Sequence, residues 1–144
     1  MRIFSTLFVA ISLWLVSNAK KPNIVIIFTD DQGYADLGCY GSKTNKTPRL
    51  DQLAKEGTMF TSFYTQAVCG PSRSALLTGR YPCRSKGWGM PASEITFAEL
   101  IKGAGYQTAC IGKWDVSNRK PIIDRMPNAQ GFDYFFGALG ANDP

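Results

Sequence analysis

A short, β-branched apolar run occupies residues 23–28, with the sequence NIVIIF. Pro22 precedes this run, and Thr29, Asp30 and Asp31 follow it. A continuous apolar run of this length, bounded by a proline and by polar residues, is typical of a strand buried on both faces, as in a parallel sheet covered by helices. The pattern therefore predicts such a strand, with two carboxylates at its carboxyl end.

The chain begins with a longer apolar run, from Ile3 to Val16, which follows Arg2 and leads into small residues that end at Ala19. A charged start, a short apolar stretch and small residues before a cut are the features of a secretory signal peptide. The alternative is a membrane anchor, but the run is shorter than the roughly 20 residues that cross a bilayer. We therefore predict that residues 1–19 are a cleaved leader and that the chain is secreted, periplasmic or otherwise exported.

Three further segments have the pattern of short helices. Residues 47–57, TPRLDQLAKEG, have a capping threonine, a proline at the first helical position and a terminating glycine. Residues 71–79, PSRSALLTG, also begin with proline and end with glycine. Thr96 and Glu99 form a capping box that opens a third helix, which runs through Lys102.

Aromatic and β-branched segments alternate with these helices. Residues 59–65 and 107–111 read as a second and a third core strand, and the aromatic segment 131–137 reads as a further strand. Together with residues 23–28, this order of strands and helices predicts a layered α/β fold. A sheet of about three strands would leave unpaired edges, so we expect the chain to be the N-terminal part of a longer protein.

Composition narrows the possible chemistry. The chain has 144 residues, 16 Lys and Arg against 11 Asp and Glu, four Cys and no His. A Ser-His-Asp triad or a histidine-rich zinc site therefore cannot be built from this chain alone. The basic residues are dispersed, without an aromatic-interleaved stripe, so we expect a solvated surface and no nucleic-acid partner.

The cysteines must be interpreted for an exported chain, in which disulfides can form. They stand at Cys39, Cys69, Cys83 and Cys110, and their spacing matches neither a zinc pattern nor a CxxC redox motif. Two bridges are possible by count. The surroundings of Cys69 argue against a structural role there, and the pairing of the other three stays open.

Asp30 and Asp31 are candidate metal ligands. In open α/β sheets, ligands bind beyond the carboxyl ends of strands, and paired carboxylates there suit a hard cation such as Ca²⁺ or Mg²⁺. A solvated turn or a helix cap is the alternative for an Asp-Asp pair.

Cys69 is predicted to lie at the mouth of the helix that begins near Pro71. A helix N-terminus supplies unpaired backbone N–H groups and a positive dipole end, and Arg73 adds a fork of donors suited to a tetrahedral oxyanion such as sulfate or phosphate. The alternative is an ordinary disulfide or buried thiol, which is common in exported chains. The sequence after Cys69 favours an anion site.

At this point the chain resembles a known family, the type I sulfatases. Residues 69–80, CGPSRSALLTGR, are similar to the family motif C-x-P-S-R-x-x-L-L-T-G-R, and residues 22–31, PNIVIIFTDD, are similar to its opening strand and metal-ligand pair. Residues 47–57 and the tripeptide Gly-Lys-Trp at 112–114 also fit. The resemblance implies an alkaline-phosphatase-like α/β sandwich with a mostly parallel central sheet, and residues 20–144 would be the N-terminal portion of its catalytic domain.

The resemblance also implies a chemistry for the site. In this family a separate formylglycine-generating, or sulfatase-maturating, enzyme converts the cysteine equivalent to Cys69 into formylglycine, and the hydrated aldehyde cleaves a sulfate monoester. Ca²⁺, with Mg²⁺ the less expected ion, would be held by Asp30, Asp31 and the converted Cys69. Arg73 would hold that residue and Lys113 would contact sulfate. The resemblance implies a sulfated substrate, and the exported location favours a sulfated small molecule or carbohydrate. Because the leader is short, no stable membrane anchor is expected.

One position departs from the family pattern. In many relatives Gly-Lys-Trp is followed by a histidine that helps to stabilise the formylglycine, whereas here Asp115 follows. A carboxylate cannot reproduce an imidazole beside a sulfate dianion, so the role of Asp115 stays open. The family's later Asp-Asn pair, histidine and second lysine would lie beyond Pro144. A non-catalytic anion-binding relative or fragment, and a phosphate or phosphonate monoester hydrolase on the same fold, are therefore alternatives.

Overall fold

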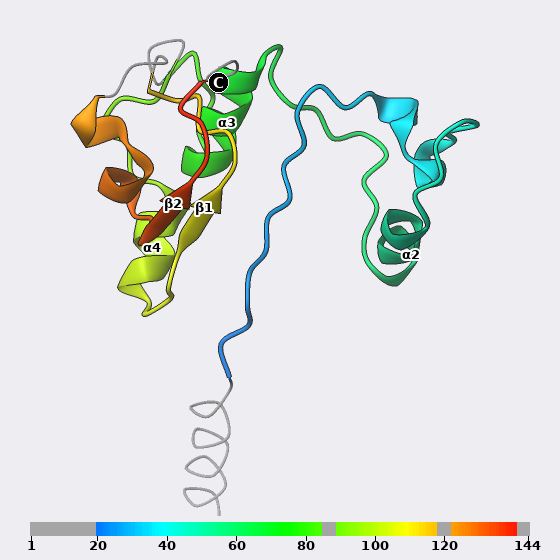
Figure 1. The fold of residues 1–144 in the computed structure, drawn as a ribbon, viewed down its shortest axis with the longest axis horizontal. Coiled ribbons are helices and arrows are strands. Elements are labelled where there is room, and N and C mark those ends of the chain that lie inside the picture. Colours follow the sequence, from blue (N-terminus) through cyan, green and yellow to red (C-terminus); the bar gives the residue numbers. More distant parts are fainter. Residues whose placement is uncertain (1–19, 85–88, 118–121, 141–144) are drawn as a thin grey trace, which may run out of the picture. The chain divides into compact units, whose positions relative to one another are not determined.

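The computed structural model describes residues 20–84, 89–117 and 122–140, so the predicted leader lies outside the described residues (Figure 1). The chain divides into two compact units, one ending at Tyr34 and the other beginning at Ala35. No helix within the described ranges is long and apolar enough to cross a membrane.

The first unit corrects the prediction of a strand at residues 23–28. This segment has no strand structure, and the side chains from Ile24 to Ile27 are 48–81% exposed. A strand exists only when a neighbour completes its hydrogen-bonded ladder, and the described part of the chain has one sheet, to which this segment does not belong. Strand-forming composition without a pairing strand is therefore not sufficient.

The three predicted helices are all present in the second unit (Figure 1). Helix α2 spans Pro48–Glu56, α3 spans Cys69–Thr78 and α4 spans Phe97–Gly103. Helix α3 begins two residues earlier than predicted, so that Cys69 is its first residue. The other described helices are short 3-10 turns at Tyr34–Asp36, Gly38–Tyr40, Ile123–Arg125 and Pro127–Gln130.

The capping box at the start of α4 is confirmed. Thr96 Oγ1 accepts a hydrogen bond from the Glu99 backbone N–H at 3.2 Å, and the Thr96 backbone N–H donates to Glu99 Oε2 at 2.7 Å. Thr96 Oγ1 also donates to the Gln130 carbonyl oxygen at 2.7 Å. This one side chain therefore fixes the start of the helix and ties it to a turn more than thirty residues away.

Two of the predicted strands form the sheet. Strand β1, Ala109–Ile111, pairs in parallel with β2, Tyr134–Phe136. The predicted strand at residues 59–65 is wrong, because this segment has no strand structure and Phe60, Phe63 and Tyr64 are exposed. Its aromatic residues match the composition of a strand, but no strand within the described residues pairs with it.

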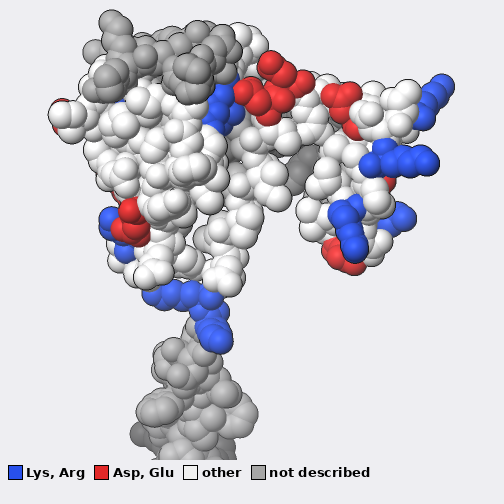
Figure 2. Space-filling model, viewed as in Figure 1, with Lys and Arg blue, Asp and Glu red and all other residues white. Residues whose placement is uncertain are grey.

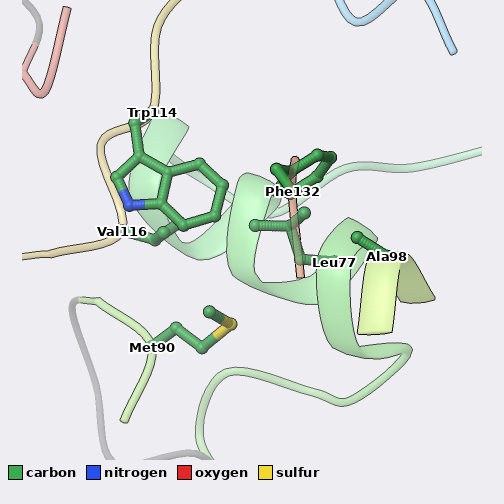
Figure 3. Packing of buried hydrophobic residues seen from close by; sticks show 6 residues of the cluster. All are labelled: Leu77, Met90, Ala98, Trp114, Val116 and Phe132. Carbon is green, nitrogen blue, oxygen red and sulfur yellow. The ribbon is translucent and has the colours of Figure 1, made fainter. Parts of the chain in front are cut away.

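A compact apolar cluster gathers side chains from α3, from α4 and from the segments around them (Figure 3). Trp114 and Phe132 meet edge to face, with 5.9 Å between ring centroids. Cys110 and Phe135, the middle residues of β1 and β2, pack against the cluster from the sheet. The six buried members of the cluster are Leu77, Met90, Ala98, Trp114, Val116 and Phe132.

The outer face of the sheet is open. Ile111, Tyr134 and Phe136 alternate with the inward-facing residues and are exposed. The molecular surface over β1 and β2 carries few charges in this view (Figure 2). The expectation that residues 107–111 form a core strand therefore holds for one face of the strand only.

Candidate active site

Cys69 occupies the first position of α3. Val68 before it has an extended backbone, with φ −146° and ψ 167°, and its carbonyl oxygen accepts the N–H of Ser72 at 3.1 Å. Pro71 fits the first turn because the N–H groups there have no partner within the helix. The half-buried Cys69 thiol thus lies where the backbone N–H groups and the helix dipole favour an anion.

The second part of the site is the segment that follows β1. Its backbone continues alongside the segment after β2: Gly112 N donates to Phe136 O at 2.8 Å, and Asp115 N donates to Leu139 O at 2.9 Å. The Trp114 ring is buried in the apolar cluster, where its Nε1 donates to Arg125 O at 2.8 Å. The buried indole and these backbone hydrogen bonds therefore fix the backbone from which the Lys113 and Asp115 side chains extend.

The two parts meet at the Cys69 side chain. Cys69 Sγ donates a hydrogen bond to Asp115 Oδ2 at 2.9 Å, and Lys113 Nζ lies 3.5 Å from the same oxygen. The Asp115 side chain is fully buried, while that of Lys113 is 16% exposed. A thiol, a carboxylate and an ammonium group thus converge at one point beside the start of α3.

Arg73, one turn into α3, joins the helix to this segment. Its Nη1 donates to the backbone carbonyl oxygen of Lys113 at 2.9 Å. Burial raises the pKa of the Cys110 thiol, and the positive charge of Arg73 partly opposes this rise. The guanidinium therefore contacts the backbone that carries Lys113, in addition to any role toward an anion.

Asp30 and Asp31 belong to the first unit, where they follow the extended segment 23–28. Asp31 has a φ of 51°, in the left-handed region that few residues other than glycine adopt. Among the described residues, no group of three or more Cys, Asp or Glu side chains gathers as a metal site. The two carboxylates supply oxygen donors suited to a hard cation, although a full Ca²⁺ shell takes about six to eight.

All four cysteines are free thiols. Cys83 is exposed, whereas Cys39, Cys69 and Cys110 are half-buried. The disulfide pairing that the sequence left open is therefore not present in this structure.

Sequence reasoning singled out Cys69, Arg73, Lys113 and Asp115, and the structure brings these four together. It missed the supporting role of Gly137. A Cβ atom at Gly137 would collide with the backbone carbonyl group of Gly112, so only glycine allows the two segments to approach this closely. A glycine directly after an aromatic strand was the available signal.

Comparison with known proteins agrees with the motifs. The family model described as Sulfatase matches residues 22–144. Arylsulfatase A of Homo sapiens is 46% identical over 136 residues, which cover 87% of this chain and 27% of that protein. Steryl-sulfatase of Homo sapiens is 42% identical over 138 residues, which cover 83% of this chain and 24% of that protein.

A solved structure is also similar. The crystal structure of Ps i-CgsB in complex with k-i-k-neocarrahexaose matches with a TM-score of 0.79 and 39% identity, over 85% of this chain and 29% of that one. The chain thus spans about a quarter of the length of the relatives that it matches. Parallel pairing of β1 and β2 beside α3 and α4 agrees with the predicted α/β class.

Proposed function

The chain belongs to the sulfatase family, and from this premise we propose that the protein containing it hydrolyses sulfate monoesters, with position 69 as the reacting group. The observation that carries this proposal is the convergence of Cys69, Lys113 and Asp115 at the N-terminus of α3. The N-terminus of α3 and the positive charges of Lys113 and Arg73 together suit a sulfate group, which carries negative charge.

The conversion of Cys69 to formylglycine is part of the proposal. Formylglycine would supply an aldehyde whose hydrate can attack the sulfur of a sulfate ester and later release sulfate, which a simple hydroxyl or thiol nucleophile cannot do in this way. The half-buried position of Cys69 leaves part of the side chain accessible to a substrate.

The cationic residues have separate tasks in this proposal. Lys113 Nζ retains some exposure and would contact a sulfate oxygen as a point charge. Arg73 holds the Lys113 backbone through a hydrogen bond to its carbonyl oxygen, and thereby fixes the position from which the ammonium group extends. Both charges would favour the anionic substrate and the negative charge that develops when the ester bond breaks.

By similarity to the family, Asp30 and Asp31 would supply carboxylate oxygens to Ca²⁺. Carboxylate oxygens are the ligands that this ion prefers, and Mg²⁺, with its stricter octahedral geometry, is the less expected ion. A bound cation would neutralise charge on the sulfate oxygens.

The expected partners follow from this assignment. The protein would meet a formylglycine-generating enzyme and would act in an exported compartment on a sulfated small molecule or carbohydrate. Support for the carbohydrate class comes from the structural relative that is described in complex with k-i-k-neocarrahexaose.

Activity assays on the full-length protein test the proposal. In calcium, with protein from a host that converts the cysteine, we expect hydrolysis of 4-nitrophenyl sulfate, and loss of this activity in Cys69→Ala. Cys83→Ala, which removes an exposed cysteine outside the site, is the matched control and should retain activity. Faster hydrolysis of 4-nitrophenyl phosphate would support the phosphatase alternative, and no hydrolysis of either ester would support a non-catalytic relative.

A further inference from the structure

Asp115 has three properties that no other described residue combines. Its side chain is fully buried, its Oδ2 atom accepts a hydrogen bond from the Cys69 thiol, and its backbone has a φ of 52°. Asp31 is the other non-glycine residue with a positive φ in the described part of the chain. Left-handed backbone at a non-glycine residue costs conformational energy and is found preferentially at functional positions.

We propose that Asp115 is a positioning residue for position 69: its carboxylate accepts a hydrogen bond from the reacting side chain and sets that side chain's orientation. In the thiol form the bond is the 2.9 Å contact from Sγ to Oδ2. After conversion, the same oxygen accepts from a hydroxyl at position 69. This second part rests on the proposed function, whereas the first part does not.

The direction of the hydrogen bond follows from the chemistry of the carboxylate. An ionised carboxylate has acceptors only, whereas an imidazole can donate or accept. With Asp115 at this place, the group at position 69 must act as the donor. Its proton is therefore directed toward Asp115, and its remaining lone pairs stay available to a substrate.

The charge of Asp115 is compensated inside the site. Burying a carboxylate costs free energy unless the group is paired and hydrogen-bonded. Lys113 Nζ lies 3.5 Å from Asp115 Oδ2, the same atom that accepts the hydrogen bond from the thiol. The ion pair allows a carboxylate to lie next to a site for an anion. Lys113 consequently has two roles in this proposal, as counter-ion to Asp115 and as contact for sulfate.

The backbone at position 115 limits which residues can replace Asp115. Asp, Asn and His are the non-glycine residues that adopt left-handed backbone most readily. Asp115→Asn and Asp115→His therefore change the chemistry without adding backbone strain. Asp115→Ala would remove the side chain and strain the backbone together, so it is not an informative variant.

Infrared spectroscopy of the full-length protein with Cys69 unconverted tests the hydrogen bond without any turnover. The S–H stretching band of Cys69, assigned by its loss in Cys69→Ala, should move to higher frequency in Asp115→Asn, because a neutral amide oxygen accepts a weaker hydrogen bond than a carboxylate. The exposed Asp124→Asn is the control and should leave the band in place. An unchanged band in Asp115→Asn would overturn the proposal.

Kinetics of the converted protein test the orientation role. Asp115→Asn should lower kcat for 4-nitrophenyl sulfate by about 10- to 100-fold, the range that corresponds to loss of a hydrogen bond to a charged group, with a smaller change in KM. Asp115→His, whose imidazole nitrogen is a more basic acceptor than the amide oxygen of Asn, should recover most of the loss. Full activity in Asp115→Asn would overturn the orientation role, whereas an inactive parent protein with the infrared shift intact would overturn only the proposed function.

Discussion

Two apolar regions of this chain have similar composition and different surroundings. Residues 23–28 form a β-branched run whose isoleucine side chains are largely exposed. The cluster around Trp114 and Phe132 is almost completely buried, although its members come from segments spread over more than fifty residues (Figure 3). Apolar composition is shared by the two regions, so burial is decided by which partners the fold supplies.

The difference extends to function, because the buried region carries the candidate site. Trp114 stands between Lys113 and Asp115, so the core that buries its ring also positions the two charged neighbours. Asp30 and Asp31 instead follow the exposed run. We therefore expect the positions of the charged groups around Cys69 to depend on core packing, so that core mutations should disturb them.

Trp114→Ala should have the largest effect on stability. Removing a buried tryptophan costs about 3–5 kcal/mol of unfolding free energy, and this variant also loses the hydrogen bond to the Arg125 carbonyl oxygen. Urea denaturation of the full-length protein measures the loss. Ile27→Ala is the control, since the exposure of Ile27 predicts a change of less than about 0.5 kcal/mol. An equal loss in both variants would show that residues 23–28 are buried in the folded protein, contrary to the exposure of Ile27 in this structure.

Gly137→Ala should have the next largest effect. The added methyl group would collide with the Gly112 carbonyl group, and overpacking of this kind costs about 1–3 kcal/mol. We also expect sulfate ester hydrolysis to fall, since Gly112 precedes Lys113 directly. Gly103→Ala, where the methyl group meets no atom within 4 Å, should be neutral or stabilising by up to about 1 kcal/mol. Gly137→Ala with normal stability and activity would contradict the close approach of the two segments.

Thr96→Ala should have a smaller effect, of about 1–2 kcal/mol, because it removes the helix cap and the hydrogen bond to the Gln130 carbonyl oxygen. The midpoint of urea denaturation measures this loss. Thr65→Ala, at an exposed position, is the control and should stay within about 0.5 kcal/mol of the parent protein. If both variants unfold at the same urea concentration, the capping box does not stabilise the fold.

The smallest effect is expected for Asp133, and only as a function of pH. The pKa of this carboxyl group is lowered mainly by its hydrogen bond with Lys102, and further by hydrogen bonds from Thr108. A lowered pKa in the folded state contributes stability above the ordinary Asp pKa of about 4, and this contribution is lost as the pH falls through the folded value.

Asp133→Asn should therefore lower Tm slightly at neutral pH and leave it unchanged in strong acid. Thermal unfolding between about pH 2 and pH 7 measures the difference on both sides of the ordinary Asp pKa. The group is exposed, so the change in Tm should be small and should shrink further in high salt. A difference that persists undiminished at the lowest pH would contradict the assigned cause.

Local features of this fold, such as helix ends, could be predicted from the sequence, whereas the pairing of strands could not. The glycine and proline signals at both ends of α2 and the Thr96 capping box act within a few residues, so sequence alone locates them. The strands predicted at residues 23–28 and 59–65 needed pairing strands that composition does not specify. Strand β1 was predicted because its apolar pattern is short and bounded, but its open face was not.

The site divides in the same way. The motif around Cys69 and Arg73 predicts an anion site at the start of α3, since the two residues lie one turn apart on a single helix. The contact between Cys69 and Asp115 joins residues 46 positions apart and depends on the turn after β1. No local pattern predicts that contact, so Asp115 could be recognised as a departure from the family but could not be given a role.

In the proposed reaction the chemistry depends on Cys69 at the mouth of α3. Mass spectrometry of the peptide that contains position 69, taken from full-length protein made in a host that converts such cysteines, tests this dependence without an activity assay. We expect the mass of the aldehyde in place of that of the thiol. A peptide that carries only the unmodified thiol, from a host shown to convert a known sulfatase, would contradict it.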